Sequence, residues 1–164
     1  MSFADTFLPE FDNEMKTTRS LLERVSFENA DWRPHTKSTG LGALASHIAG
    51  LAGYGAMIVT ETGMDMAKRS GGKPAQYSNS ADVLTAFDAN VKKSRDAVAS
   101  LTDDAMTTPW TLSAGDHVIF TLPRAAVLRT MMMNHMIHHR GQLSVYLRLN
   151  DVLLPSIYGP TADT

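Results

Sequence analysis

Apolar side chains recur at helical spacing in four long stretches of the chain, and this periodicity constrains the fold more than any other feature of the sequence. The predicted helices span residues ~5 to 27, ~40 to 62, ~80 to 101 and ~122 to 150. In each helix the apolar residues recur mainly three or four positions apart, so they lie on one face. Helices with one apolar face bury it by packing together, so the sequence predicts an all-α fold, a four-helix bundle.

Residues that cap helices mark two of the predicted boundaries. The Ser38-Thr39 pair is suited to cap the second helix, and Ser80 is suited to cap the third. The connections 64–79 and 102–121 are long. We therefore expect long crossover connections rather than a simple up-and-down order.

The connection 102–121 contains two short runs of β-prone residues. They are Trp110-Thr111-Leu112 and Val118-Ile119-Phe120, with a Ser-Ala-Gly-Asp turn between them. The pattern is compatible with a small hairpin or with a loop, and the sequence does not decide between them.

Composition excludes several classes of function. The 164 residues include no cysteine, which removes disulfides, thiolate ligands and a cysteine nucleophile. The net charge is −2, and the one dense basic cluster, Lys92, Lys93 and Arg95, is explained by a solvated helix face, so we expect no nucleic-acid partner. We identify no apolar uncharged run of ~18 residues and no signal segment. The prediction is a single domain, residues 1–164, in the cytoplasm and without a membrane partner.

Three of the six histidines are expected to face the core. His135 and His139 lie four positions apart, which is about 40° around a helix, and they share the apolar face of the fourth helix. The same spacing places His47 on the apolar face of the second helix. His138 falls about 60° from His135 on the other side, near the edge of that face.

These three histidines indicate a metal site. A lone buried histidine such as His47 is more often a hydrogen-bonded core residue. Two imidazoles four positions apart can bind one ion, however, and a third from a facing helix completes a set that leaves positions open for water or substrate. Burying several unpaired imidazoles would also cost desolvation free energy. We therefore predict one divalent metal ion per chain at His47, His135 and His139, with zinc, nickel or iron as candidates.

Other metal sites are disfavoured by what the sequence lacks. Met136 stands where HExxH metalloproteases carry their catalytic glutamate, and the helices have no pair of ExxH motifs for a di-iron centre. The residues Met131 to Met133 point in directions about 100° apart, which indicates core filling rather than a copper site. His35 and His117 lie outside the helical faces and are expected to be surface or locally bonded residues.

Three segments together resemble one known family. They are DWRPHTKSTGLGALASHIAGL around His47, TLPRAAVLRTMMMNHMIHHRGQLSVYLR around His135 and His139, and the tail PSIYGPTAD. They are similar to the DinB-like family of damage-inducible proteins, which is grouped with bacillithiol and mycothiol S-transferases. The resemblance implies an up-down-down-up four-helix bundle, a homodimer, and a divalent metal on three histidines that map onto these same positions. Similar proteins often carry glycine after the last helix, where this chain has Asn150-Asp151, residues that also tolerate left-handed backbone.

The resemblance and the predicted site together suggest an enzyme whose metal activates a thiol or water. It would be a thiol-dependent S-transferase for electrophilic small molecules, or a hydrolase. Because the chain has no thiol, a low-molecular-weight thiol would have to arrive as a cosubstrate. Tyr54, Gln142, Tyr146 and Tyr158 are candidates to orient the substrate.

Two further alternatives remain open from the sequence. The metal could be structural, joining the second and fourth helices of a non-catalytic, stress-related protein. The chain could also be an interaction module without a metal. In the enzyme hypothesis, the connections 64–79 and 102–121 are expected to line the mouth of the site.

Overall fold

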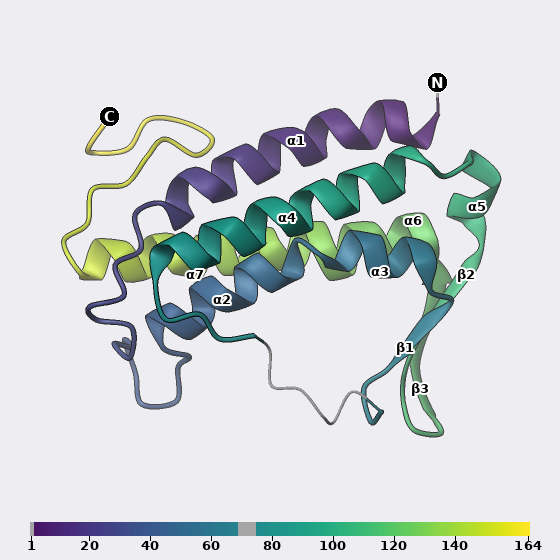
Figure 1. The fold of residues 1–164 in the computed structure, drawn as a ribbon, viewed down its shortest axis with the longest axis horizontal. Helices are drawn as coiled ribbons and strands as arrows, with labels where there is room; N and C mark the ends of the chain where they lie inside the picture. Colours follow the sequence, from purple (N-terminus) through teal and green to yellow (C-terminus); the bar gives the residue numbers. More distant parts are fainter. Residues whose placement is uncertain (1, 69–74) are drawn as a thin grey trace.

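The computed structural model describes residues 2–68 and 75–164 and is mostly helical (Figure 1). In chain order the elements are α1 (Phe3–Leu22), α2 (Leu41–Leu51), α3 (Tyr54–Thr60), β1 (Gly63–Asp65), α4 (Ser80–Ala99), α5 (Asp103–Thr107), β2 (Pro109–Ala114), β3 (His117–Pro123), α6 (Arg124–Val127), the π-helix η1 (Leu128–Asn134) and α7 (His135–Leu149). The middle of the predicted 64–79 connection, residues 69–74, lies outside the described residues.

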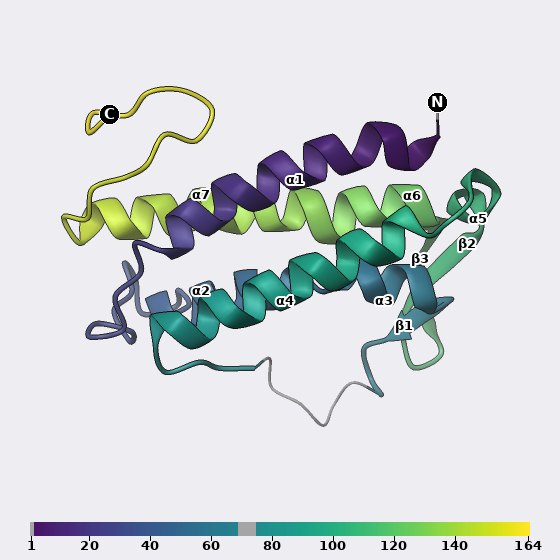
Figure 2. The ribbon, with the colours of Figure 1, turned by 45° about the horizontal axis from the view of Figure 1, so that its top comes forward.

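The long helical segments lie side by side along the molecule (Figures 1 and 2). They are α1, the pair α2–α3, α4, and the continuous run α6–η1–α7, which ends at the yellow C-terminal tail. α1 and the α6–η1–α7 run point one way and the other two point the opposite way, so the order along the chain is up, down, down, up. Their apolar faces meet in one core, in which Phe7, Phe11, Phe87 and Leu128 are each at most 1% exposed.

The structure corrects the all-α prediction, because a three-stranded sheet lies at one end of the helices. β1 pairs in parallel with β2, and β2 pairs antiparallel with β3. Of the two predictions for the connection 102–121, the hairpin is correct, because β2 and β3 pair directly. Gly115, with a φ of 61°, lies in the turn of this hairpin. β1 was not expected from the sequence. Its pairing needs Gly63, because a Cβ atom there would lie 2.5 Å from the Thr111 carbonyl oxygen.

The second predicted helix is broken between α2 and α3, and α4 supplies the hydrogen bonds that the break leaves unmade. Ser94 donates from Oγ to the Ala52 carbonyl at 2.5 Å and accepts from the Ala56 amide at 3.1 Å. Asn90 donates from Nδ2 to the Ala49 carbonyl at 2.9 Å. These backbone groups therefore stay hydrogen-bonded despite the break, because side chains of the neighbouring helix α4 replace their helical partners.

The predicted cap of the second helix is also wrong. Gly40 is the N-cap, and it makes no side-chain capping bond. Instead, carbonyl groups of the preceding loop accept from the first helical amides: Trp32 from Leu41 at 2.9 Å and Ala30 from Gly42 at 2.8 Å. Backbone groups thus do what a serine or threonine cap would otherwise do.

The cap of the third predicted helix is one residue earlier than expected. Asn79, rather than Ser80, caps α4 by accepting from the Asp82 amide at 2.9 Å. Ser80 instead donates to the Val25 carbonyl at 2.6 Å, which ties the start of α4 to the loop that follows α1.

One stretch differs from the expectation that no segment could span a membrane. Residues Leu41–Thr60, which cover α2 and α3, are long and apolar enough to span a membrane by length and composition, with a mean hydropathy of 1.4 over a window of 18 residues. In the structure, 56% of this window is buried inside the protein. Core helices pass the same test, so the stretch is weak evidence for a membrane span.

Close packing between α3 and α4 gives a stability test at Gly55. A Cβ atom at Gly55 would lie 2.7 Å from Ser94 Cβ and 2.8 Å from Met132 Sδ. We expect Gly55→Ala to lower the free energy of unfolding by roughly 1–3 kcal/mol, because the helices must move apart. The matched control is Gly50→Ala, where nothing lies within 4 Å of the added Cβ. It should leave stability unchanged or raise it by up to ~1 kcal/mol in urea unfolding of the metal-free protein, and an equal loss in both variants would contradict the packing argument.

Candidate metal centre

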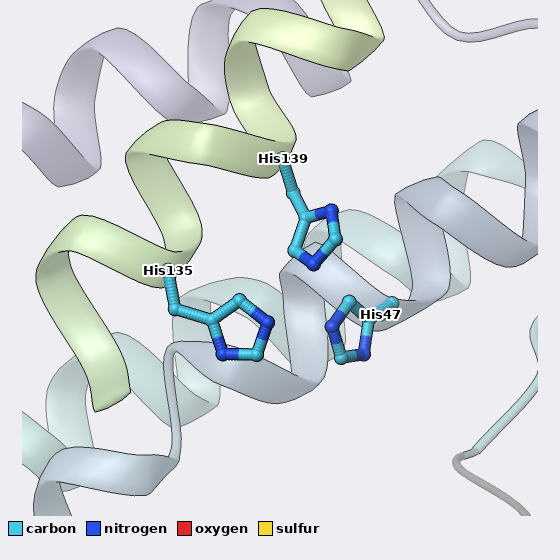
Figure 3. Close-up of side chains that lie close together, drawn as sticks. All are labelled: His47, His135 and His139. Atoms are coloured by element: carbon cyan, nitrogen blue, oxygen red, sulfur yellow. The ribbon is translucent and has the colours of Figure 1, made fainter. Parts of the chain in front are cut away.

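Three histidine rings from two helices converge on one point. His47 comes from α2, and His135 and His139 come from α7, with their rings turned toward one another (Figure 3). The ring centroids are 5.3 Å apart for His47 and His135, 4.6 Å for His47 and His139, and 4.7 Å for His135 and His139. One nitrogen from each ring lies within 4.8 Å of the other two. This is the set that helical spacing selects from the sequence.

His135 is placed directly after an irregular segment. The seven residues of η1 form a π-helix, which ends at Asn134. Such wide turns are rare and often occur at functional sites, because each one shifts the following residues around the helix axis. Met132 and Met133 within η1 are fully buried, which confirms that these two side chains fill the core. Met131 is partly buried and lines the pocket described below.

The orientation of α7 is fixed on its other side by a buried ion pair. Arg140 Nη1 lies 2.6 Å from Glu14 Oε2 of α1, and the two side chains are 2% and 8% exposed. The Tyr158 hydroxyl joins them, accepting from Arg140 Nη2 at 2.5 Å and lying 2.9 Å from Glu14 Oε2. Burial and the hydrogen bond to Glu14 raise the pKa of Tyr158. This cluster was not expected from the sequence, where its one sign is a charged residue, Arg140, directly after the inward-facing His139.

The three histidines are partly buried, which favours their neutral form. Burial, and then the nearby His139 and His135, lowers the pKa of His47 to about 4. Burial also lowers the pKa of His135, reinforced by His139, and burial lowers the pKa of His139. Neutral imidazoles carry the free lone pair that a metal requires, so the group is ready to bind an ion near neutral pH.

Gln142 orients one of the rings. Its Oε1 lies 2.7 Å from His139 Nδ1, and because an amide oxygen can only accept, His139 must donate from Nδ1. The Nε2 atom of His139 is then left with its lone pair. Partners of this kind fix the tautomer of metal-binding histidines, so Gln142, predicted as a substrate residue, is better placed as a support for His139.

An apolar pocket of about 630 Å³ borders the histidines. His47 and His135 form part of its wall, and Tyr54 lines it close by. Residues from the ends of the 64–79 connection and from the β2–β3 hairpin also line it, as expected for segments at the mouth of the site.

The other predicted residues lie elsewhere. Tyr146 is 9% exposed and packs edge-on against Trp32, with centroids 5.5 Å apart, while the Tyr158 hydroxyl is engaged by the ion pair. His138 is exposed and does not belong to the ligand group found in residues 2–68 and 75–164. His35 and His117 are exposed, and His35 Nδ1 accepts from the Lys37 amide, so both are surface or locally bonded residues as predicted.

The family model of the DinB family matches residues 1–163 of the chain. The chain belongs to the DinB family. A comparison with curated proteins found no match.

Solved structures similar to this DinB-family chain share its fold. A DinB-like protein from Bacillus cereus ATCC 10987 is 21% identical, with a TM-score of 0.69 over 93% of this chain and 95% of the other. One from Bacillus subtilis is 19% identical, with a TM-score of 0.69 over 92% and 96%. A DinB-family protein from Exiguobacterium sibiricum 255-15 is 21% identical, with a TM-score of 0.63 over 99% and 98%. The mostly helical DinB-like fold is therefore shared.

The donor set of this DinB-family chain fits a divalent ion of intermediate softness. Three imidazole nitrogens suit zinc, nickel or iron, whereas magnesium and calcium prefer oxygen ligands. Within the described part of the chain the group contains no carboxylate. Three protein ligands leave a coordination position for an exchangeable molecule.

The ligand set can be tested by single substitutions. We expect His47→Ala, His135→Ala and His139→Ala each to abolish tight binding of one metal ion per chain, because each removes one of three donors. His138→Ala is the matched control, since it removes a neighbouring exposed imidazole, and it should keep wild-type binding. Metal content after dialysis and titration calorimetry would measure this. Equal loss of metal in His138→Ala would contradict the assignment.

The lowered pKa of His47 gives a pH test of the metal-free protein. Its folded value of about 4 lies below the unfolded value near 6.5, so the unfolded chain binds more protons between these limits. Stability should therefore be fully present above pH ~6.5 and fall as the pH drops toward 4. The urea midpoint measured across this range should fall less in His47→Gln than in the wild type, and parallel curves would contradict this cause.

Proposed function

We propose that this DinB-family chain is a metal-dependent enzyme that transfers an external thiol to an electrophilic small molecule. In this proposal His47, His135 and His139 hold one zinc, nickel or iron ion. The observation that carries the proposal is the convergence of three imidazoles with lowered pKa values, two of which line an apolar pocket. A reactant in the pocket would lie next to the ion.

The chain's own residues explain why the nucleophile should come from outside. The sequence has no cysteine, and Met136 replaces the glutamate that would serve as a base. A bound divalent ion would lower the pKa of a thiol or water at its open position. A thiol starts from a pKa of ~8.5 and water from ~15.7, so without a neighbouring base the thiol is the easier nucleophile to ionise.

Two features support a catalytic site over a structural one. Structural zinc sites are usually closed by four protein ligands, whereas the described residues offer three. The three histidines are also only partly buried, and two of them, His47 and His135, line a pocket. The large apolar core, with Phe7, Phe11 and Phe87, does not involve them, so the helices have a reason to stay packed without a metal.

Hydrolysis is the second candidate, because the same open position could hold water. The remaining parts of the proposal have two sources. The homodimer and the small-molecule substrate rest on the family resemblance, whereas the single domain, the bundle of four helices and the cytoplasmic location rest on length, helical periodicity and composition.

Thiol dependence tests the proposed reaction. With the metal-loaded protein, the thiol sulfur should replace the chlorine of an electrophile such as a chloronitrobenzene, so that a C–S bond forms, the C–Cl bond breaks, and chloride and the thiol proton are released. This turnover should rise with the concentration of a small thiol and disappear in His135→Ala, because the thiol has no anchor there. Gly141→Ala, an exposed change on the same helix, should keep wild-type turnover. Circular dichroism after chelation should retain the helical signal.

The alternative outcomes separate the rivals. Turnover of an ester panel without added thiol would favour hydrolysis. Collapse of the helical signal on chelation would favour a structural metal.

A further inference from the structure

We propose that the pocket beside the three histidines selects an electrophile with an uncharged, apolar body and excludes charged ones. This inference rests on the proposed function, because it assigns the substrate class of the same site. It is carried by the sheet, which builds the wall of the pocket that faces the helices.

The three strands present one row of apolar side chains to the pocket. Met64 of β1 pairs with Leu112 of β2, and Leu112 pairs with Phe120 of β3. Residues directly opposite each other in a sheet point to the same face, so these three form a continuous row. All three line the pocket, together with Leu51 of α2 and Met131 of η1.

The described lining of the pocket offers no charged side chain to balance a charged ligand. Among the described residues that line it there is no Asp, Glu, Lys or Arg. Ser46, one of its few polar residues, already donates to the Gly42 carbonyl at 2.8 Å and accepts from the Tyr77 amide at 3.2 Å. A charged group placed against the apolar row of the sheet would lose water without gaining a partner there, which is costly. The volume of about 630 Å³ is that of a site for a small organic molecule.

The position of the histidines decides which reactant occupies the pocket. His47 and His135 are part of its wall, but His139 is not. On the His139 side the neighbouring Gln142 and His138 are exposed. A thiol with a polar body can therefore approach from the solvent-exposed side next to His139, which leaves the apolar pocket for the electrophile.

Two dyes that differ by one charge test the selection without any turnover. N-phenyl-1-naphthylamine is neutral and apolar, and 8-anilinonaphthalene-1-sulfonate has the same rings with a sulfonate. In the metal-free protein, where no ion can attract the sulfonate, we expect the neutral dye to bind one per chain and at least ~10-fold more tightly, by fluorescence titration. Equal affinities for the two dyes would overturn the proposal.

A pair of glycine substitutions tests the location. Gly50 lines the pocket, and nothing lies within 4 Å of an added Cβ, so the backbone there has room for a side chain and Gly50→Phe should place its ring in the pocket. Gly141 is equally open but does not line the pocket. Gly50→Phe should weaken binding of the neutral dye by ~10-fold or more, and Gly141→Phe should leave it unchanged. Wild-type affinity in Gly50→Phe, or the same loss in both, would overturn the proposal.

A charge variant covers the case in which Gly50→Phe does not fold. Met66 lines the pocket and is 52% exposed, so Met66→Lys is tolerated sterically and should shift the preference several-fold toward the sulfonated dye. Leu149→Lys, at a position 56% exposed outside the pocket, is its control. Because dye binding needs neither metal nor thiol, correct dye selectivity without thiol-dependent turnover would overturn only the enzyme proposal. Thiol-dependent turnover without dye selectivity would overturn only the proposal that the pocket selects uncharged electrophiles.

Discussion

The buried ion pair between Arg140 and Glu14 is the constraint on which the histidine site depends. Both side chains are almost fully buried, and Arg140 also donates to the Glu14 carbonyl at 3.2 Å. Separating such a pair would leave an uncompensated buried charge, at a cost of about 3–5 kcal/mol. α7 therefore cannot slide or rotate freely against α1. Since His139 directly precedes Arg140, the same contact holds the His139 ring on the side of the helix that faces α2.

The parts of this structure that sequence predicts are those set by local geometry. The helical period of 3.6 residues locates the long helices, and it selects His47, His135 and His139 from six histidines without knowledge of their neighbours. Asp151, with a φ of 57°, adopts the left-handed conformation expected after the last helix. Each of these inferences needs only residues within a turn or two along the chain.

The parts that sequence misses depend on distant partners. The break after α2 is possible because the Ser94 hydroxyl, 42 residues away, donates to the Ala52 carbonyl in place of a helical amide. β1 exists because Gly63 allows the Thr111 backbone to approach, and a helical pattern gives no sign of that pairing. Tyr158 is a reasonable substrate residue by type, but its hydroxyl is engaged by Glu14, 144 residues away. The helical period of the apolar residues gives no information on such contacts between distant parts of the chain.

In the proposed function, chemistry and selectivity lie in two different parts of the chain. The helices α2 and α7 supply the three imidazoles, and their spacing is fixed by helix packing and by the ion pair to α1. The sheet supplies the apolar row that faces the pocket, and its strands lie at one end of the helices (Figure 1). A side-chain change in the sheet can therefore alter what the pocket admits while leaving the histidine geometry in place, since the sheet takes no part in the contact between α2 and α7. On the proposed function, the same fold could in this way keep one metal centre and vary its substrates.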